Sequence, residues 1–173
     1  MNVLELFKNI SVFIFDVDGV LTDGTVLVLE NGLQARQMNI KDGLGLQMAL
    51  KNGFRVLIIS GGNSKPVEER LNKLGLKDVF MSVGDKKSFV NQYLQENGLQ
   101  WNETLFMADD LPDLETLKAV KVACCPADAV MEVKEVAHYI SPLNGGFGCA
   151  RDIIEKVLKV QDKWIFDKTV TSR

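Results

Sequence analysis

Cysteine is scarce in this sequence, and so are the patterns that would give it a structural or catalytic role. Three cysteines, Cys124, Cys125 and Cys149, stand among 173 residues, and they form no CxxC pair. An odd number suits reduced thiols in the cytosol better than a disulfide framework. We therefore expect the three side chains to act as small buried hydrophobic groups.

Long apolar runs and an excess of basic charge are missing as well. The apolar runs are too short for a transmembrane helix, and residues 1–10 lack the basic region, apolar core and cleavage site of a secretory signal. The 20 basic and 23 acidic residues give a net charge of −3, which argues against broad nucleic-acid binding but leaves room for a local basic pocket. We expect a cytoplasmic protein that binds neither membrane nor nucleic acid.

Apolar residues are numerous enough for one folded domain. They make up 46% of the chain, and 173 residues suit a single domain with a real core, residues 1–173. Short β-rich runs alternate with segments of helical spacing, which predicts an α/β fold: a three-layer, Rossmann-like parallel sheet with helices on both faces. The expected strands are 11–16, 55–60, 79–83, 104–108, 121–125 and 138–141. The expected helices are 42–53, 65–75, 86–97, a segment from 112, 128–137 and a segment from 150.

One segment departs from this alternation. Residues 25–40 hold an Asn31–Gly32 turn between two extended runs, which predicts a protruding β-hairpin. The stretches on either side of Ser60 are filled by the hairpin, two helices and short strands, so no room remains for a separate cap domain. Residues 161–173 are expected to form a C-terminal tail.

Three carboxylates follow the first apolar run closely. Asp16, Asp18 and Asp23 lie within the stretch VFIFDVDGVLTDG, and like charges at this spacing repel one another. A bound metal ion, covalent chemistry or a solvated turn could each account for the arrangement. The rest of the chain has to distinguish these explanations.

Residues far apart in the sequence meet at one edge of the predicted sheet. Asp16, Ser60, Lys86 and Asp109 fall at or just after the carboxyl ends of strands, or at the start of the next helix, where ligands bind in such folds. Carboxylate oxygens suit Mg²⁺. A hydroxyl, an ammonium group and backbone N–H groups such as that of Gly61 suit phosphoryl oxygens. The sequence therefore predicts Mg²⁺-assisted phosphoryl transfer at this edge.

Each of these residues also has a simpler explanation. Asp16 and Asp18 could form an acidic turn, and Ser60 could cap the segment that follows it. Lysines are common on protein surfaces, so Lys87 competes with Lys86, which we prefer because it opens a helix.

The second acidic cluster and the helix after Ser60 have alternatives too. Asp110 and Asp113 could favour the N-terminus of a helix through its dipole. Arg70 faces either a substrate carboxylate or solvent. His138, the single histidine, starts a strand more readily than it performs catalysis.

Taken together, the motifs resemble those of a known family. DVDGV followed by LTDG, then Ser60, Lys86 and DDLPD, look like the four motifs of the haloacid dehalogenase (HAD) superfamily of aspartate-nucleophile phosphatases. The segments NIKDGLGLQ, CCPADAV, EVAHYIS and GGFGCARD resemble the small capless subgroup that includes 3-deoxy-D-manno-octulosonate 8-phosphate (KDO 8-phosphate) phosphatases. The resemblance spans roughly residues 10–160.

The resemblance implies a role for each matched residue. Asp16 would be the nucleophile that forms an aspartyl-phosphate, and Asp18 would protonate the sugar alkoxide and then activate water. Mg²⁺ would be held by Asp16, the backbone carbonyl of Asp18 and Asp109. The residues that would bind the phosphoryl oxygens are Ser60, Gly61 and Lys86.

Further residues bear on the substrate and the metal. Asp110 and Asp113 would orient the waters of the metal or support their loop, and Arg70 would meet a substrate carboxylate. The chain departs from many relatives at Asn63, where they carry a basic residue, and at Phe147, where some carry arginine. The implied substrate is KDO 8-phosphate, with a 2-keto-3-deoxy-nonulosonate 9-phosphate as the alternative. The resemblance also implies a role in lipopolysaccharide biosynthesis and a homotetramer whose hairpins help to close neighbouring active sites.

Two functions of other classes compete with a phosphatase. A phospho-accepting signalling domain also uses an aspartate, Mg²⁺, a hydroxyl and a lysine on a parallel sheet, but its phosphorylated aspartate lies on a later strand. Here the first strand carries both Asp16 and an acid two residues further on, which favours turnover. The intact motif set likewise argues against a non-catalytic partner of a sugar nucleotide-transferring enzyme.

Overall fold

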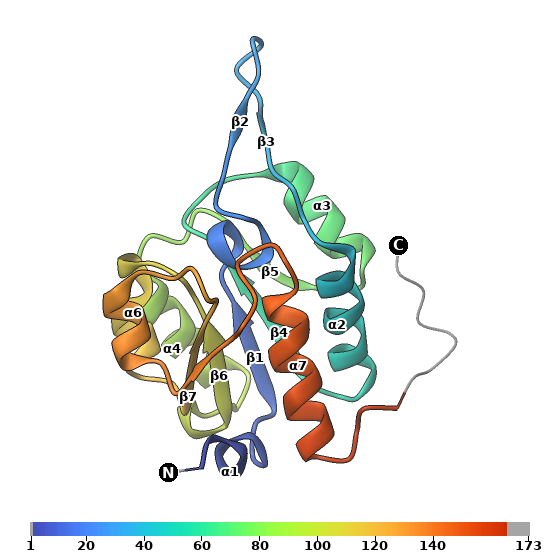
Figure 1. Ribbon diagram of the computed structural model, residues 1–173, viewed down its shortest axis with the longest axis vertical. Helices are drawn as coiled ribbons and strands as arrows, with labels where there is room; N and C mark the ends of the chain where they lie inside the picture. The colour runs from blue at the N-terminus through green and yellow to red at the C-terminus, as the bar shows by residue number, and fades with distance from the viewer. Residues whose placement is uncertain (1, 166–173) are drawn as a thin grey trace.

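A parallel sheet forms the centre of the computed structural model, which describes residues 2–165 (Figure 1). Its six strands run in the order β5-β4-β1-β6-β7-β8, and every neighbouring pair is parallel. They are β1 (Val12–Phe15), β4 (Arg55–Ile59), β5 (Asp78–Phe80), β6 (Thr104–Met107), β7 (Val122–Cys125) and β8 (Tyr139–Ile140). The predicted parallel, Rossmann-like sheet is therefore confirmed.

Helices connect the strands, as the alternation predicted. They are α1 (Val3–Phe7), α2 (Ile40–Lys51), α3 (Lys65–Lys73), α4 (Lys86–Glu96), α5 (Leu114–Leu117), α6 (Met131–Val136) and α7 (Cys149–Val160). The prediction missed α1, and it extended α6 beyond its actual length. In place of one helix from residue 112, a 3₁₀ turn (Leu111–Asp113) leads into the short α5.

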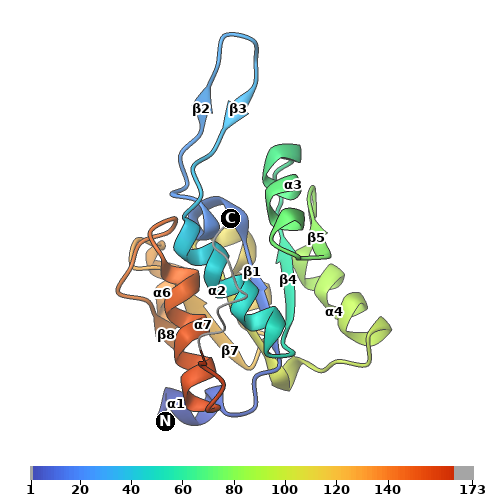
Figure 2. The same ribbon diagram turned by 90° about the vertical axis from the view of Figure 1, so that its right-hand side faces the viewer.

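The sheet is covered on both faces because alternate residues of each strand point to opposite sides. Phe13 and Phe15 of β1 pack with α1, α2, α3 and α7, whereas Val12 and Ile14 pack with α4, α5 and α6. Figures 1 and 2 show α2 and α7 together on one face. Fully burying one such side chain contributes roughly 1.5–3 kcal/mol, so these two clusters hold the strand ends in place.

The predicted hairpin projects from the sheet (Figure 2). Its strands, β2 (Leu27–Val28) and β3 (Gln34–Ala35), are antiparallel and shorter than expected. Gly32 permits the turn at φ +79°, and the Leu29 N–H donates a 2.9 Å hydrogen bond to the Leu33 carbonyl. A bridge between Thr22 and Met38 closes the base.

The hairpin is the protruding part of an otherwise layered molecule. Between the hairpin and α4 the described chain holds only α2, β4, α3 and β5, so the expected lack of a cap domain is confirmed.

Within residues 2–165, no helix combines the length and the hydropathy that crossing a membrane requires. Of the expected tail 161–173, residues 166–173 lie outside the described residues.

The cysteines lie in the core. Cys124, Cys125 and Cys149 are all free and buried, as expected. Burial raises the pKa of Cys125 to about 11 and raises the pKa of Cys124 and Cys149 as well.

Candidate active site

The carboxyl ends of four neighbouring strands converge on one cavity. Asp16 directly follows β1, Ser60 follows β4, Asp109 comes soon after β6, and Lys86 opens α4 after β5. The cavity has a volume of about 370 Å³. Among the residues that line it are Asp16, Asp18, Ser60, Gly61, Lys86, Asp109, Asp110 and Asp113. The structure thus brings together every predicted site residue except Arg70.

Lys86 links two carboxylates at the bottom of this cavity. Its Nζ lies 2.8 Å from Asp16 Oδ1 and 2.8 Å from Asp113 Oδ2. Burial alone would lower the pKa of Lys86, but the charges of Asp16 and Asp113 outweigh it and raise that pKa. Lys87 instead has a side chain that is 50% exposed and lies 3.7 Å from Glu115. Lys86 is therefore the lysine of the site, as preferred from the sequence.

Negative charge exceeds positive charge in the cavity. Burial, followed by the charge of Asp16, raises the pKa of Asp109 to about 7 and that of Asp113 to about 6. Burial also raises the pKa of Asp16, although Lys86 opposes the effect. One ammonium group does not neutralise these carboxylates, which leaves the cavity suited to a further cation.

The donor atoms suit Mg²⁺. Asp113 Oδ1 is buried and has no hydrogen-bond partner among the described residues, and Asp16, Asp109 and Asp113 all line the same cavity. Hard carboxylate and carbonyl oxygens are the ligands that Mg²⁺ takes, usually one or two carboxylates together with several waters. Within residues 2–165, no three His, Cys, Asp or Glu side chains form a ready-made metal cage.

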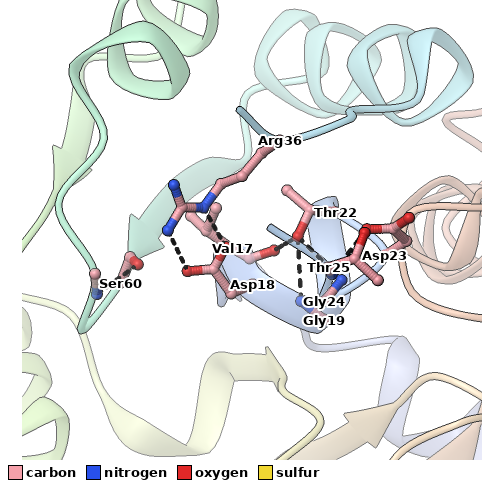
Figure 3. A network of polar contacts seen from close by, with 10 residues as sticks. Val17, Asp18, Gly19, Thr22, Asp23, Gly24, Thr25, Arg36 and Ser60 are labelled. Atoms are coloured by element: carbon pink, nitrogen blue, oxygen red, sulfur yellow. Dashed lines mark hydrogen bonds and ion pairs between the residues drawn. The ribbon is translucent and has the colours of Figure 1, made fainter. Parts of the chain in front are cut away.

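The chain after Asp16 makes a tight turn that only glycine allows. Gly19 has φ +88°, and a Cβ on it would collide with the carboxylate of Asp109. Thr22 Oγ1 accepts hydrogen bonds of 3.3 Å from the N–H groups of Gly19 and Gly24 (Figure 3). Gly145 packs on the Gly19 carbonyl from the other side, where a Cβ would clash. This turn brings Asp18 and Asp109 to the same cavity.

Asp23, the third carboxylate of the first motif, is not part of the cavity lining. Its Oδ1 accepts hydrogen bonds of 2.9 Å and 2.7 Å from the backbone N–H and the hydroxyl of Thr25. These bonds lower the pKa of Asp23. The solvated turn is therefore the explanation for Asp23, whereas Asp16 and Asp18 face the cavity.

An arginine that the sequence did not single out reaches the site from the hairpin. Arg36 Nε lies 2.6 Å from Asp18 Oδ1, and Arg36 Nη2 lies 3.4 Å from Asp18 Oδ2 (Figure 3). No local pattern marks Arg36, because the pair joins residues 18 apart across the base of the hairpin. Ser60 Oγ, which lines the same cavity as Asp18, accepts a 3.1 Å hydrogen bond from the Gly62 N–H.

Arg70 lines a second, larger cavity rather than the first one. This cavity of about 1000 Å³ lies between the hairpin and α3, and Arg36, Asn63 and Arg70 are among its lining residues.

Phe147 is 62% exposed. His138 Nδ1 accepts a 3.0 Å hydrogen bond from the Ala123 N–H, which fits the structural role expected for it next to β8.

Known proteins resemble this chain over most of its length. No family model matches the sequence. A curated relative from Yersinia pestis, 3-deoxy-D-manno-octulosonate 8-phosphate phosphatase KdsC, is 30% identical over 162 residues, which cover 94% of this chain and 87% of the relative.

Solved structures are similar over nearly the whole chain. The 3-deoxy-D-manno-octulosonate 8-phosphate phosphatase from Moraxella catarrhalis, in complex with magnesium ion, phosphate ion and KDO, matches with a TM-score of 0.91 and 28% identity. The match covers 94% of this chain and 93% of that one. A structure described as a HAD superfamily (subfamily III A) hydrolase from Legionella pneumophila has a TM-score of 0.90 and 32% identity, and covers 92% of this chain and 88% of its own.

Proposed function

The chain belongs to the KDO 8-phosphate phosphatase family of the HAD superfamily, and on that premise we propose that it hydrolyses KDO 8-phosphate to KDO and inorganic phosphate with Mg²⁺ as cofactor. The observation that carries the proposal is the position of Lys86 between Asp16 and Asp113, in a cavity that Asp18 and Asp109 also line. A buried lysine among acidic groups at the carboxyl end of a parallel sheet is suited to holding a phosphoryl group.

Asp16 is the proposed nucleophile. A carboxylate oxygen of Asp16 attacks phosphorus, and the bond between phosphorus and the ester oxygen of the sugar breaks. Asp18 gives its proton to that oxygen, so the sugar leaves as an alcohol and an aspartyl-phosphate remains. Lys86, Ser60 and the N–H of Gly61 hold the phosphoryl oxygens during the transfer.

Hydrolysis of the aspartyl-phosphate completes the cycle. The carboxylate of Asp18 takes a proton from water, whose oxygen attacks phosphorus. The bond between phosphorus and Asp16 then breaks, inorganic phosphate forms, and both carboxyl groups return to their starting states. One residue thus acts as acid in the first step and as base in the second.

The proposed ligands of Mg²⁺ are Asp16, the backbone carbonyl of Asp18, and Asp109. When bound, the ion supplies positive charge that neutralises the phosphate dianion and the surrounding carboxylates. Asp110 and Asp113 support this arrangement: Asp113 holds Lys86, and Asp110 Oδ1 accepts a 2.8 Å hydrogen bond from the Leu111 N–H at the start of the next turn.

The hairpin supports a further part of the proposal, that this cytoplasmic enzyme, as we propose it to be, forms a homotetramer. Leu27, Val28 and Leu33 are 64%, 68% and 62% exposed, an unusual concentration of apolar side chains on one projecting element. Packing of hairpins against neighbouring subunits would bury these side chains and cover an open site. Light scattering should give the mass of a tetramer, and Leu27→Asp combined with Leu33→Asp should lower both that mass and the turnover.

The substrate is tested by a phosphate-release screen. KDO 8-phosphate, a 2-keto-3-deoxy-nonulosonate 9-phosphate and glucose 6-phosphate are compared with Mg²⁺ and with chelator. We expect the highest kcat/KM for KDO 8-phosphate, as a supplier of KDO for lipopolysaccharide requires. A higher value for the nine-carbon substrate would reassign the specificity, and equal values for glucose 6-phosphate would indicate a general phosphatase.

A further inference from the structure

We propose that Arg36 is a positioning residue that sets the orientation of the Asp18 carboxyl group and thereby couples the base of the hairpin to proton transfer. The inference rests on the proposed function, because it concerns Asp18 as the acid that protonates the leaving sugar. The observation behind it is the two-point contact between a hairpin side chain and this carboxylate.

The contact fixes a direction as well as a distance. Arg36 approaches both oxygens of Asp18, at 2.6 Å through Nε and 3.4 Å through Nη2. A guanidinium that meets two carboxylate oxygens restricts rotation of the carboxylate, which a single donor does not. The Gly62 backbone lies close to the same group, since a Cβ at Gly62 would stand 3.1 Å from Asp18 Oδ2. The same Cβ would stand 3.6 Å from Arg36 Nη2, so the absence of a side chain at Gly62 leaves room for the Arg36–Asp18 pair.

Burial of the two partners is unequal. The side chain of Arg36 is 7% exposed, whereas that of Asp18 is 36% exposed. Water can reach Asp18, so this carboxylate does not need Arg36 to be tolerated in the fold. Arg36, in contrast, is a buried charge whose ion-pair partner among the described residues is Asp18. What Arg36 adds to Asp18 is orientation.

The position of Arg36 in the chain connects this orientation to the hairpin. Arg36 directly follows β3 and stands two residues before Met38, which pairs with Thr22 at the base. Asp18 stands four residues before Thr22, in the turn that leads from β1 to the hairpin. The Arg36–Asp18 pair therefore joins the hairpin to the turn after β1, and any displacement of the hairpin relative to the sheet carries the guanidinium with it.

The leaving group reveals whether Arg36 acts through Asp18. A sugar alkoxide is a poor leaving group and needs the proton of Asp18, whereas p-nitrophenolate leaves without one. General acid catalysis contributes about 10²- to 10⁴-fold, and a misdirected acid loses a part of this. We expect Arg36→Ala to lower kcat/KM about 10- to 100-fold for KDO 8-phosphate, within that contribution. For p-nitrophenyl phosphate we expect little change.

Matched variants separate positioning from general damage to the hairpin. Gln34→Ala lies on β3, is exposed and should behave as wild type with both substrates. Arg36→Lys keeps the charge with one donor group and should recover only part of the loss. Melting temperatures establish that each variant is folded.

The outcomes are distinguishable. A selective loss for KDO 8-phosphate, in kcat rather than in KM, supports the positioning role. Wild-type kcat/KM in folded Arg36→Ala overturns it, and so does an equal loss with both substrates or a rise in KM alone, because these indicate a structural anchor or a binding residue. Wild-type protein that releases no phosphate from KDO 8-phosphate overturns the proposed function instead.

Discussion

The carboxylate of Asp42 in α2 accepts a 2.7 Å hydrogen bond from the backbone N–H of Arg151 in the first turn of α7. Asp42 is 2% exposed, so this bond joins the two helices in the interior. An acidic group at a helix N-terminus satisfies a free N–H and interacts favourably with the helix dipole. Burial nevertheless dominates and raises the pKa of Asp42 to about 6.

This raised pKa makes the Asp42 contribution to stability depend on pH. The folded-state pKa lies above the unfolded value of about 3.9, so the contribution is fully present below about pH 4 and is lost as the pH rises to about 6. The variant Asp42→Asn cannot titrate. We expect wild type to lose up to about 3 kcal/mol of unfolding free energy relative to Asp42→Asn across this window, measured by urea denaturation at several pH values.

Asp85→Asn is the matched control for that measurement. Hydrogen bonds from Ser88 lower the pKa of Asp85 at the N-terminus of α4, so its contribution should be lost as the pH falls. Between about pH 4 and pH 6 the difference in stability between wild type and Asp85→Asn should therefore stay constant, whereas the difference between wild type and Asp42→Asn should change with pH. If the difference in unfolding free energy between wild type and Asp42→Asn did not change with pH, the raised pKa of Asp42 would be contradicted.

Asp16→Asn should release no phosphate while the protein stays folded. An amide cannot act as the nucleophile, and Lys86 keeps Asp113 as a partner at 2.8 Å, so the core should tolerate the change. Phosphate release from KDO 8-phosphate and the melting temperature are measured on freshly purified protein, with mass spectrometry to exclude deamidation. Near-wild-type turnover would refute the assignment of Asp16.

Lys86→Met and Lys87→Met test two neighbouring lysines in opposite environments. Removing Lys86 leaves two buried carboxylates without their cation, which typically costs about 3–5 kcal/mol. Removing Lys87 breaks an exposed pair and should change stability by less than about 1 kcal/mol. Urea denaturation gives both values, and phosphate release should disappear only in Lys86→Met. Similar behaviour of the two variants would mean that Lys86 has no special role.

Magnesium binding should strengthen as the pH rises. Because the pKa of Asp109, a proposed ligand, is raised to about 7, protons compete with the ion below this value. Calorimetric titration with Mg²⁺ should give a lower Kd at about pH 8 than at about pH 6. Asp109→Asn should bind weakly at both pH values. Binding that is equally tight across this range would place the ion elsewhere.

The sequence predicted the sheet and most of the cavity because both depend on local patterns. Each buried strand is a short apolar run, and in a parallel sheet the residue that follows such a run lies at a known edge. Asp16, Ser60 and Asp109 were therefore predictable together. Lys86 was preferred to Lys87 because it opens the predicted helix, and in the structure Lys86 lines the cavity.

Contacts between distant segments could not be predicted in this way. The pairing of Arg36 with Asp18 depends on how the hairpin meets the sheet, which no periodicity records. Arg70 was placed on the correct helix, but in the structure it lines the larger cavity between α3 and the hairpin. The short helix α1 was missed because five residues carry too little periodic signal.

The three buried cysteines can serve as natural reporters of the unfolding of this protein. A thiolate is the species that alkylating reagents attack, and burial both blocks access and raises the pKa of Cys124, Cys125 and Cys149. Cys124 and Cys125 lie on β7 and Cys149 opens α7, so labelling requires separation of the sheet from its covering helices. The rate at which an added reagent alkylates each cysteine therefore measures how readily the core opens around that residue, without any engineered reporter group.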